Sequence, residues 1–277
     1  MTLGSACAVV AASPGTTAAV EALCPGGLPE GWCQIRPYRV VGRLWFETDS
    51  DARAAVAALR TAGHAAVLGP PDAQHEAAWA NRNRPTVIGS RLAVCFPWVE
   101  VQLRVDHVVE IDPGIGFGTG SHPSTTLILE ELCTRDLSSC SVADIGCGSG
   151  VLSVAAAVMG ARRSVGIDVN VEGLMAARAN AVLNGVVDRV DVSPTPVHDL
   201  AEAGDVFDLV LANIHAPVIA EMAEHLARLT APHGTLVLSG LSIAQVSVLR
   251  ARFPIFEFEA PRRLDDWVAL VGQRSPR

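Results

Sequence analysis

The sequence contains no lysine, and all 21 of its basic residues are arginine. The 29 acidic residues outnumber them and give a net charge of −8. An acidic balance disfavours nonspecific binding to phosphate backbones, and it suits a basic protein as partner. We therefore expect a protein substrate or ligand and no direct contact with nucleic acid.

Paired cysteines, metal-ligand clusters and long apolar runs are also lacking. The seven cysteines form no CxxC pair, which is typical of reduced thiols rather than a disulfide framework. No His, Cys or carboxylate cluster has metal-ligand spacing, so no metal is expected. Apolar runs stay well short of the roughly 20 residues of a membrane span. The apolar patch at 6–12 has no Lys or Arg before it, unlike a secretion signal, so we expect a cytoplasmic protein.

The first part of the chain has the pattern of a small α+β domain. Strands are predicted at 6–12, 38–47 and 65–69, and helices at 16–24 and 50–62, the second with Ser50 as its N-cap. This order suggests a ferredoxin-like domain over residues 1–72. A polar, Ala-rich linker is expected at 73–90, with a short helix around 75–81. A larger second domain would occupy 91–277.

From about residue 140, apolar strands alternate with helices. Strands are predicted at 141–146, 164–169, 206–214, 234–241, 255–260 and 267–273, and helices at 151–160, 170–184 and 217–229. Continuous apolar strands in such an alternation indicate an α/β fold with a parallel sheet covered on both faces. Sheets of this kind bind ligands at the C-terminal ends of their strands.

The first of these strands runs into a glycine loop, DIGCGSG at 144–150. Its spacing is GxGxG, because position 151 is Val where a dinucleotide fingerprint needs a third glycine. Asp144, just ahead of the loop, would repel a pyrophosphate but attract a ligand that carries a sulfonium and an ammonium group. Gly146 and Gly148 are thus predicted to contact such a cofactor. A nicotinamide dehydrogenase is a weaker interpretation.

Asp168 is predicted to bind the ribose of this cofactor. It lies 18 residues past the loop, at the end of the second strand. A carboxylate at that point can accept both hydroxyls of a ribose, as nucleoside cofactors require. Together, the loop and this carboxylate resemble the Rossmann-like methyltransferases that use S-adenosyl-L-methionine.

Two further segments are more specific: DPGIGFGTGSHPSTT at 112–126 and ANI at 212–214. With the glycine loop, they resemble the ribosomal protein L11 methyltransferase family (PrmA type) over roughly residues 76–277. The resemblance implies a seven-stranded, Rossmann-like methyltransferase domain behind a small substrate-recognition domain. It also implies S-adenosyl-L-methionine as cofactor and N-methylation of lysine or α-amino groups of ribosomal protein L11. Codon bias, in a chain that is also rich in Ala, Gly and Arg, accounts for the lack of lysine; the weaker interpretation is that an enzyme which modifies lysines gains by carrying none.

The resemblance also assigns roles within the first segment. Thr126 matches a cofactor-binding threonine, and its hydroxyl could bind the methionine carboxylate near a helix N-terminus; the structural alternative is a plain N-cap. Phe117 would form an apolar cover over the cofactor. His122 either orders the backbone, which we favour, or acts as a base.

Asn213 is the predicted catalytic residue and a predicted cofactor contact. Its side-chain carbonyl, with the neighbouring main-chain carbonyl, can orient the N–H groups of an amine and aim its lone pair at the methyl group. An α-amine, with an ordinary pKa near 7.7–8.0, is an easier target than lysine near 10.4.

Three residues depart from the family pattern: Gly116, Ser124 and His215, which stands where the family usually has Leu. They leave the cofactor prediction intact and the substrate open, so the alternative is a relative that methylates another protein, a peptide or a small amine. A regulatory module that binds cofactor without turnover is disfavoured by the complete glycine loop and by Asn213.

Overall fold

The computed structural model describes residues 6–36, 39–69, 83–101, 104–112 and 120–276. Contacts divide the chain into an N-terminal unit, Met1–Pro85 with Cys95–Leu103, and a C-terminal unit, Thr86–Val94 with Arg104–Arg277. Segment 95–103 thus groups with the N-terminal unit, whereas the expected boundary stands at 90/91. The short helix expected around 75–81 lies outside the described residues.

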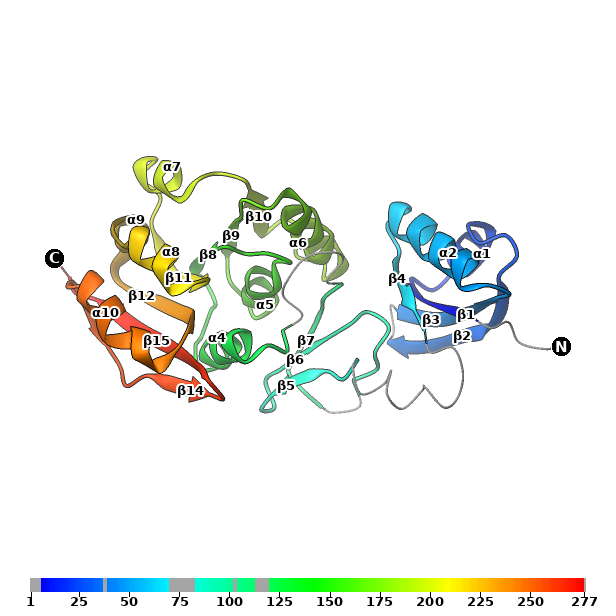
Figure 1. Ribbon diagram of the computed structural model, residues 1–277, viewed down its shortest axis with the longest axis horizontal. Helices are drawn as coiled ribbons and strands as arrows, with labels where there is room; N and C mark the ends of the chain where they lie inside the picture. Colours follow the sequence, from blue (N-terminus) through cyan, green and yellow to red (C-terminus); the bar gives the residue numbers. More distant parts are fainter. Residues whose placement is uncertain (1–5, 37–38, 70–82, 102–103, 113–119, 277) are drawn as a thin grey trace. The chain divides into compact units, whose positions relative to one another are not determined.

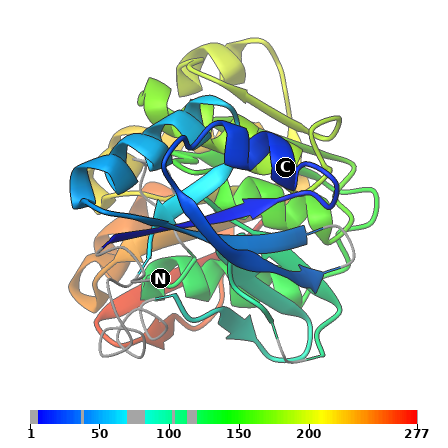
Figure 2. The same cartoon turned by 90° about the vertical axis from the view of Figure 1, so that its right-hand side faces the viewer.

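The N-terminal unit is a four-stranded antiparallel sheet with helices on one face. Its elements are β1 (Ala6–Ala12), α1 (Thr17–Ala22), β2 (Leu28–Arg36), β3 (Arg39–Phe46), α2 (Asp49–Thr61) and β4 (Ala65–Leu68). The strands lie in the order β2-β3-β1-β4, and Figures 1 and 2 show both helices over the same face. This order is the ferredoxin-like arrangement that the sequence suggested.

Strand β1 is the centre of this unit and is buried on both faces. Ala8 and Val10 pack against the helices, while Cys7 and Val9 pack on the other face with Trp98. A strand covered on both sides reads as one apolar run, which explains why its sequence does not alternate.

Two details of this unit differ from the sequence prediction. Strand β2 was not predicted, because Pro29 and Gly31 interrupt its pattern and its pairing with β3 shifts register there. The N-cap of α2 is Thr48, whose side chain accepts a hydrogen bond from the Asp51 N–H at 3.1 Å. The prediction of Ser50 for this position is wrong, since the helix begins earlier at Asp49.

The C-terminal unit is built on a large sheet of mixed direction. Its strands are β8 (Ser141–Ile145), β9 (Arg163–Ile167), β10 (Val190–Ser193), β11 (Phe207–Asn213), β12 (Thr230–Leu241), β13 (Phe256–Phe258), β14 (Arg262–Leu264) and β15 (Trp267–Arg274). The order is β10-β9-β8-β11-β12-β15-β13, and β14 pairs with β15. The first five of these strands are parallel, and β15 is antiparallel to β12. The parallel sheet predicted from the alternation of strands and helices is confirmed for these five strands, whereas β15 runs antiparallel at this edge.

Helices cover both faces of this sheet (Figure 1). One face packs against α4 (Pro123–Cys133), α5 (Val151–Val158) and α6 (Val171–Leu183). The other packs against α7 (Val197–Glu202), α8 (Ala216–Glu221), α9 (Ala223–Leu229) and α10 (Val246–Arg252). The helix predicted at 217–229 is two helices, because the backbone leaves helical geometry at Met222. In the sequence, α4 and the large sheet are preceded by a separate sheet of β5 (Thr86–Ile88), β6 (Leu92–Cys95) and β7 (His107–Glu110).

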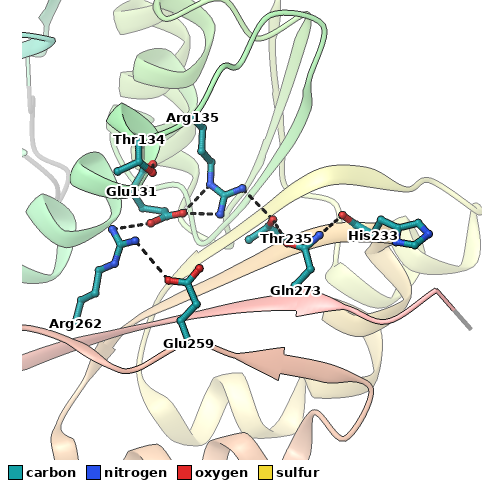
Figure 3. A network of polar contacts seen from close by, with 8 residues as sticks. All are labelled: Glu131, Thr134, Arg135, His233, Thr235, Glu259, Arg262 and Gln273. Carbon is teal, nitrogen blue, oxygen red and sulfur yellow. Dashed lines mark hydrogen bonds and ion pairs between the residues drawn. The ribbon is translucent and has the colours of Figure 1, made fainter.

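A buried carboxylate joins α4 to the antiparallel edge of the sheet (Figure 3). Glu131, 2% exposed, accepts a hydrogen bond from Arg135 Nε at 2.7 Å and pairs with Arg262 Nη1 at 2.7 Å. Arg135 also donates to Thr235 Oγ1 at 3.0 Å. These contacts fix the helix that carries residues 123–126 relative to β12 and β14.

Candidate functional site

A cavity of about 700 Å³ opens at the C-terminal ends of the parallel strands β8, β9, β11 and β12. Four of the five predicted site residues line it: Gly146, Gly148, Asp168 and Asn213. Its remaining lining residues are mostly apolar or aromatic, with several histidines: His122, Ser124, Ile145, Ile167, Val169, Thr195, Pro196, Val197, His198, Ile214, His215, Val218, Met222, Gly240 and Trp267. The site therefore lies where a sheet of this kind binds its ligands.

The glycine loop is held by hydrogen bonds to the end of β9. The N–H groups of Gly146 and Cys147 donate to the Ile167 carbonyl at 2.8 and 3.0 Å. Gly146 has a φ of +78°, and a Cβ there would lie 2.4 Å from Cγ2 of Ile214. Any other residue here would strain the backbone and collide with Ile214, so the position requires glycine.

Asp168 lies directly after β9 and holds the loop through its side chain. Its two carboxylate oxygens accept the N–H groups of Gly148 and Asn170, each at 2.8 Å. A carboxylate oxygen can accept more than one hydrogen bond, so this side chain can also accept ligand hydroxyls in the cavity. One residue thus orders the glycine loop and presents acceptors to the site.

Asp144 is a buried carboxylate beneath the same loop, 1% exposed. Its Oδ2 accepts the Ser153 hydroxyl at 2.7 Å and the Ser153 N–H at 3.1 Å. Burial raises the pKa of Asp144 to about 6; the charge of Asp168 adds to this rise, and the Ser153 hydrogen bonds oppose it. Within the described part of the chain, its Oδ1 is buried without a hydrogen-bond partner. Negative charge here favours a cationic ligand above the loop.

Asn213 ends β11, and its side chain is oriented by helix α4. The Nδ2 of Asn213 donates to Oγ1 of Thr125 at 3.0 Å, and Thr125 is 1% exposed. Thr126, which the sequence predicted as a cofactor contact, donates to the Gly120 carbonyl at 3.3 Å and is not among the lining residues. Thr125 is the residue that sequence reasoning missed, because a Ser-Thr-Thr run does not reveal which hydroxyl faces the strand.

His122 is the N-cap of α4. Its Nδ1 accepts the Ser124 N–H at 3.3 Å, and its ring meets that of Trp267 edge-on at 4.7 Å. This geometry agrees with the backbone-ordering role that the sequence favoured for it. His122 and Trp267 both line the cavity and form an aromatic side of it. Phe117, the expected cofactor cover, lies outside the described residues.

None of the helices in the described residues is long and apolar enough to cross a membrane. In the same residues, no group of three or more His, Cys, Asp or Glu side chains could hold a metal ion.

The strand order, the GxGxG loop and the acidic residue after the second parallel strand define the class of protein: a Rossmann-like methyltransferase that uses S-adenosyl-L-methionine. The family model for ribosomal protein L11 methyltransferase (PrmA) matches residues 47–275. The chain belongs to this family.

Individual relatives agree with the family model. The chain is 34% identical over 245 residues to the ribosomal protein L11 methyltransferase of Haemophilus ducreyi, covering 83% of each chain. It is 39% identical over 208 residues to the protein of the same name from Shewanella halifaxensis, covering 74% of this chain and 69% of the relative. Among solved structures, the ribosomal protein L11 methylase of Lactobacillus delbrueckii subsp. bulgaricus matches with a TM-score of 0.63 and 27% identity, over 69% of this chain and 99% of the other.

Proposed function

We propose that this chain transfers methyl groups from S-adenosyl-L-methionine to lysine or α-amino groups of ribosomal protein L11. Membership of the family supports the substrate. The observation that carries the proposal is the cavity in which the glycine loop, Asp168 and Asn213 meet.

The residues present fit the cofactor. Asp168 offers carboxylate acceptors for the ribose hydroxyls, and Gly146 and Gly148 line the cavity without a side chain that could block a ligand. The buried carboxylate of Asp144 below the loop complements a ligand of positive charge. When bound, the cofactor supplies a methyl group on a positively charged sulfur, which a neutral amine can attack.

Asn213 would orient the acceptor amine. Because its Nδ2 donates to Thr125, its Oδ1 is the atom that can accept an N–H from the substrate. The Ile214 carbonyl, next in the chain, would accept a second N–H. Two acceptors fix the direction of the nitrogen lone pair, and such alignment accounts for much of the rate of a transfer reaction.

Neither of these two oxygens is a strong base. The amine must therefore arrive neutral or lose its proton to water, and an α-amine does so more readily at neutral pH than a lysine. The mostly apolar lining, with Ile145, Val218 and Met222, would keep water away from the acceptor. Both kinds of amine are compatible with this arrangement, and the α-amine is favoured on pKa alone.

The N-terminal unit would recognise the substrate. It is a separate compact unit with its own apolar core, so it can serve as a docking domain without disturbing the cavity. The net charge of −8 suits a basic ribosomal protein. We place the enzyme in the cytoplasm, where ribosomal proteins are made.

Mass spectrometry of purified L11 tests the proposal. The protein is incubated with the enzyme and S-adenosyl-L-methionine, and peptides are mapped to locate each added methyl group. Increments on lysine or α-amino groups that require both enzyme and cofactor are expected. Unmodified L11, with methylation of another protein or a small amine instead, would contradict the substrate and favour the alternative relative.

A further inference from the structure

Ile214 directly follows β11 and lies between two glycines, one in the loop after β8 and one in β12. Gly146 of the loop faces its side chain, and Gly240 near the end of β12 faces its backbone. Gly240 has a φ of +82°, and a Cβ there would lie 2.7 Å from the Ile214 carbonyl oxygen and 3.2 Å from its carbonyl carbon. Real Cβ atoms do not approach backbone this closely, and backbone cannot yield by rotating a side chain.

The end of β12 has little freedom to move away from Ile214. Ser239 pairs in register with Asn213 across the parallel strands. The Ser239 hydroxyl, fully buried, lies 2.9 Å from the Ser124 carbonyl and 3.3 Å from the Val268 carbonyl. These contacts tie the residue before Gly240 to both α4 and β15. A side chain at position 240 would therefore displace Ile214 rather than β12.

We propose that Gly240 is a positioning residue for methyl transfer, which keeps the Ile214 carbonyl where the acceptor amine needs it. The inference rests on the proposed function, in which Asn213 Oδ1 and the Ile214 carbonyl orient the amine. Gly240 and Ile214 both line the cavity. The three atoms nearest to a Cβ on Gly240 all belong to the Ile214 backbone, so the effect is directed at the acceptor side of the site.

Gly240→Ala tests this, with Gly204→Ala as its matched control. Gly204 has the same φ of +82°, and a Cβ there would meet nothing within 4 Å. Both variants carry the strain of a left-handed alanine, and only the first meets Ile214. We expect Gly240→Ala to lower kcat for L11 by roughly tenfold or more, with an unchanged Kd for S-adenosyl-L-methionine by calorimetry. Gly204→Ala should keep the wild-type kcat and Kd.

Asparagine variants at the same two positions separate backbone strain from contact. Asparagine tolerates the left-handed region better than other side chains, yet it still carries a Cβ. Gly240→Asn should therefore fold and bind cofactor while kcat stays low, and Gly204→Asn should behave as wild type.

Two results would overturn the proposal. One is a wild-type kcat in either Gly240 variant. The other is loss of both cofactor binding and turnover in both Gly240 variants but not in the Gly204 variants, which would assign Gly240 to the fold alone. Failure of the wild-type enzyme to methylate L11 is a different result, because it contradicts the proposed function and not the positioning role.

Discussion

The buried carboxylate of Asp144 gives the stability of this protein a pH dependence of unusual sign. Its pKa rises from 3.8 to about 6 in the folded state, chiefly because burial disfavours the charged form. A rise of this size corresponds to about 3 kcal/mol of free energy of unfolding. Replacement with asparagine removes the titration, while the amide oxygen can still accept hydrogen bonds from Ser153.

The sign follows from proton binding. Between the unfolded and folded pKa values, the folded protein binds more protons than the unfolded chain at this site. The contribution of Asp144 is therefore fully present below its unfolded pKa and is lost as the pH rises through about 6. About half of that loss, roughly 1.5 kcal/mol, falls between about pH 5 and about pH 7.5.

Urea unfolding of the cofactor-free protein measures this loss. The change in unfolding free energy between the two pH values is determined for wild type and for Asp144→Asn. Other titrating groups are common to both proteins and cancel in the difference. The wild type should lose about 1.5 kcal/mol more than the variant as the pH rises. The stability lost between the two pH values should be larger in Ser153→Ala than in wild type, because this variant lacks a hydrogen bond that opposes the rise in the pKa of Asp144.

Parallel stability curves for wild type and Asp144→Asn would refute the reasoning. They would mean that the carboxylate ionises as readily in the folded protein as in the unfolded chain. The negative charge beneath the glycine loop would then be better solvated than its burial implies, and its attraction for a cationic cofactor would be weaker.

Three other substitutions test the cofactor site, the catalytic residue and the packing of α4. Asp168→Ala should weaken cofactor binding by about 1.5–3 kcal/mol in calorimetry, and an unchanged affinity would exclude the ribose role. Asn213→Ala should retain the circular dichroism spectrum while turnover falls by more than about tenfold; normal turnover would remove it from the mechanism. Glu131→Gln should destabilise the fold by about 2–3 kcal/mol, because it leaves two partly exposed arginines without their buried partner. The control variant Glu130→Gln, one residue earlier in α4, should keep a free energy of unfolding in urea within about 0.5 kcal/mol of wild type.

Most of the large sheet could be predicted from the sequence, because its parallel strands are short apolar runs between clear helix patterns. The strands at β8, β9 and β11 lie within two residues of the predicted ranges. The direction of β15 could not be predicted, since an apolar run has the same pattern whichever way it pairs. Strand β10 was missed because it has only four residues and the exposed Asp191 interrupts its apolar pattern. The break between α8 and α9 at Met222 was missed because no glycine or proline marks it in the sequence.

The site was predictable where one residue type is chemically required. Glycines at a tight loop and a carboxylate after a strand follow from the needs of a nucleoside cofactor, and Gly146 and Asp168 do line the cavity. Contacts between distant segments were not predictable. Thr125 meets Asn213 across 88 residues of sequence, and the fit of Gly240 against Ile214 depends on the register of β11 and β12.

A crystal structure of the chain with S-adenosylhomocysteine would test most directly whether the cavity binds the cofactor. The ribose hydroxyls should lie within hydrogen-bond distance of Asp168, and the sulfur should lie beside Asn213 at the end of β11. Electron density for this nucleoside away from the cavity, or its absence at saturating concentration, would contradict the assignment of the site.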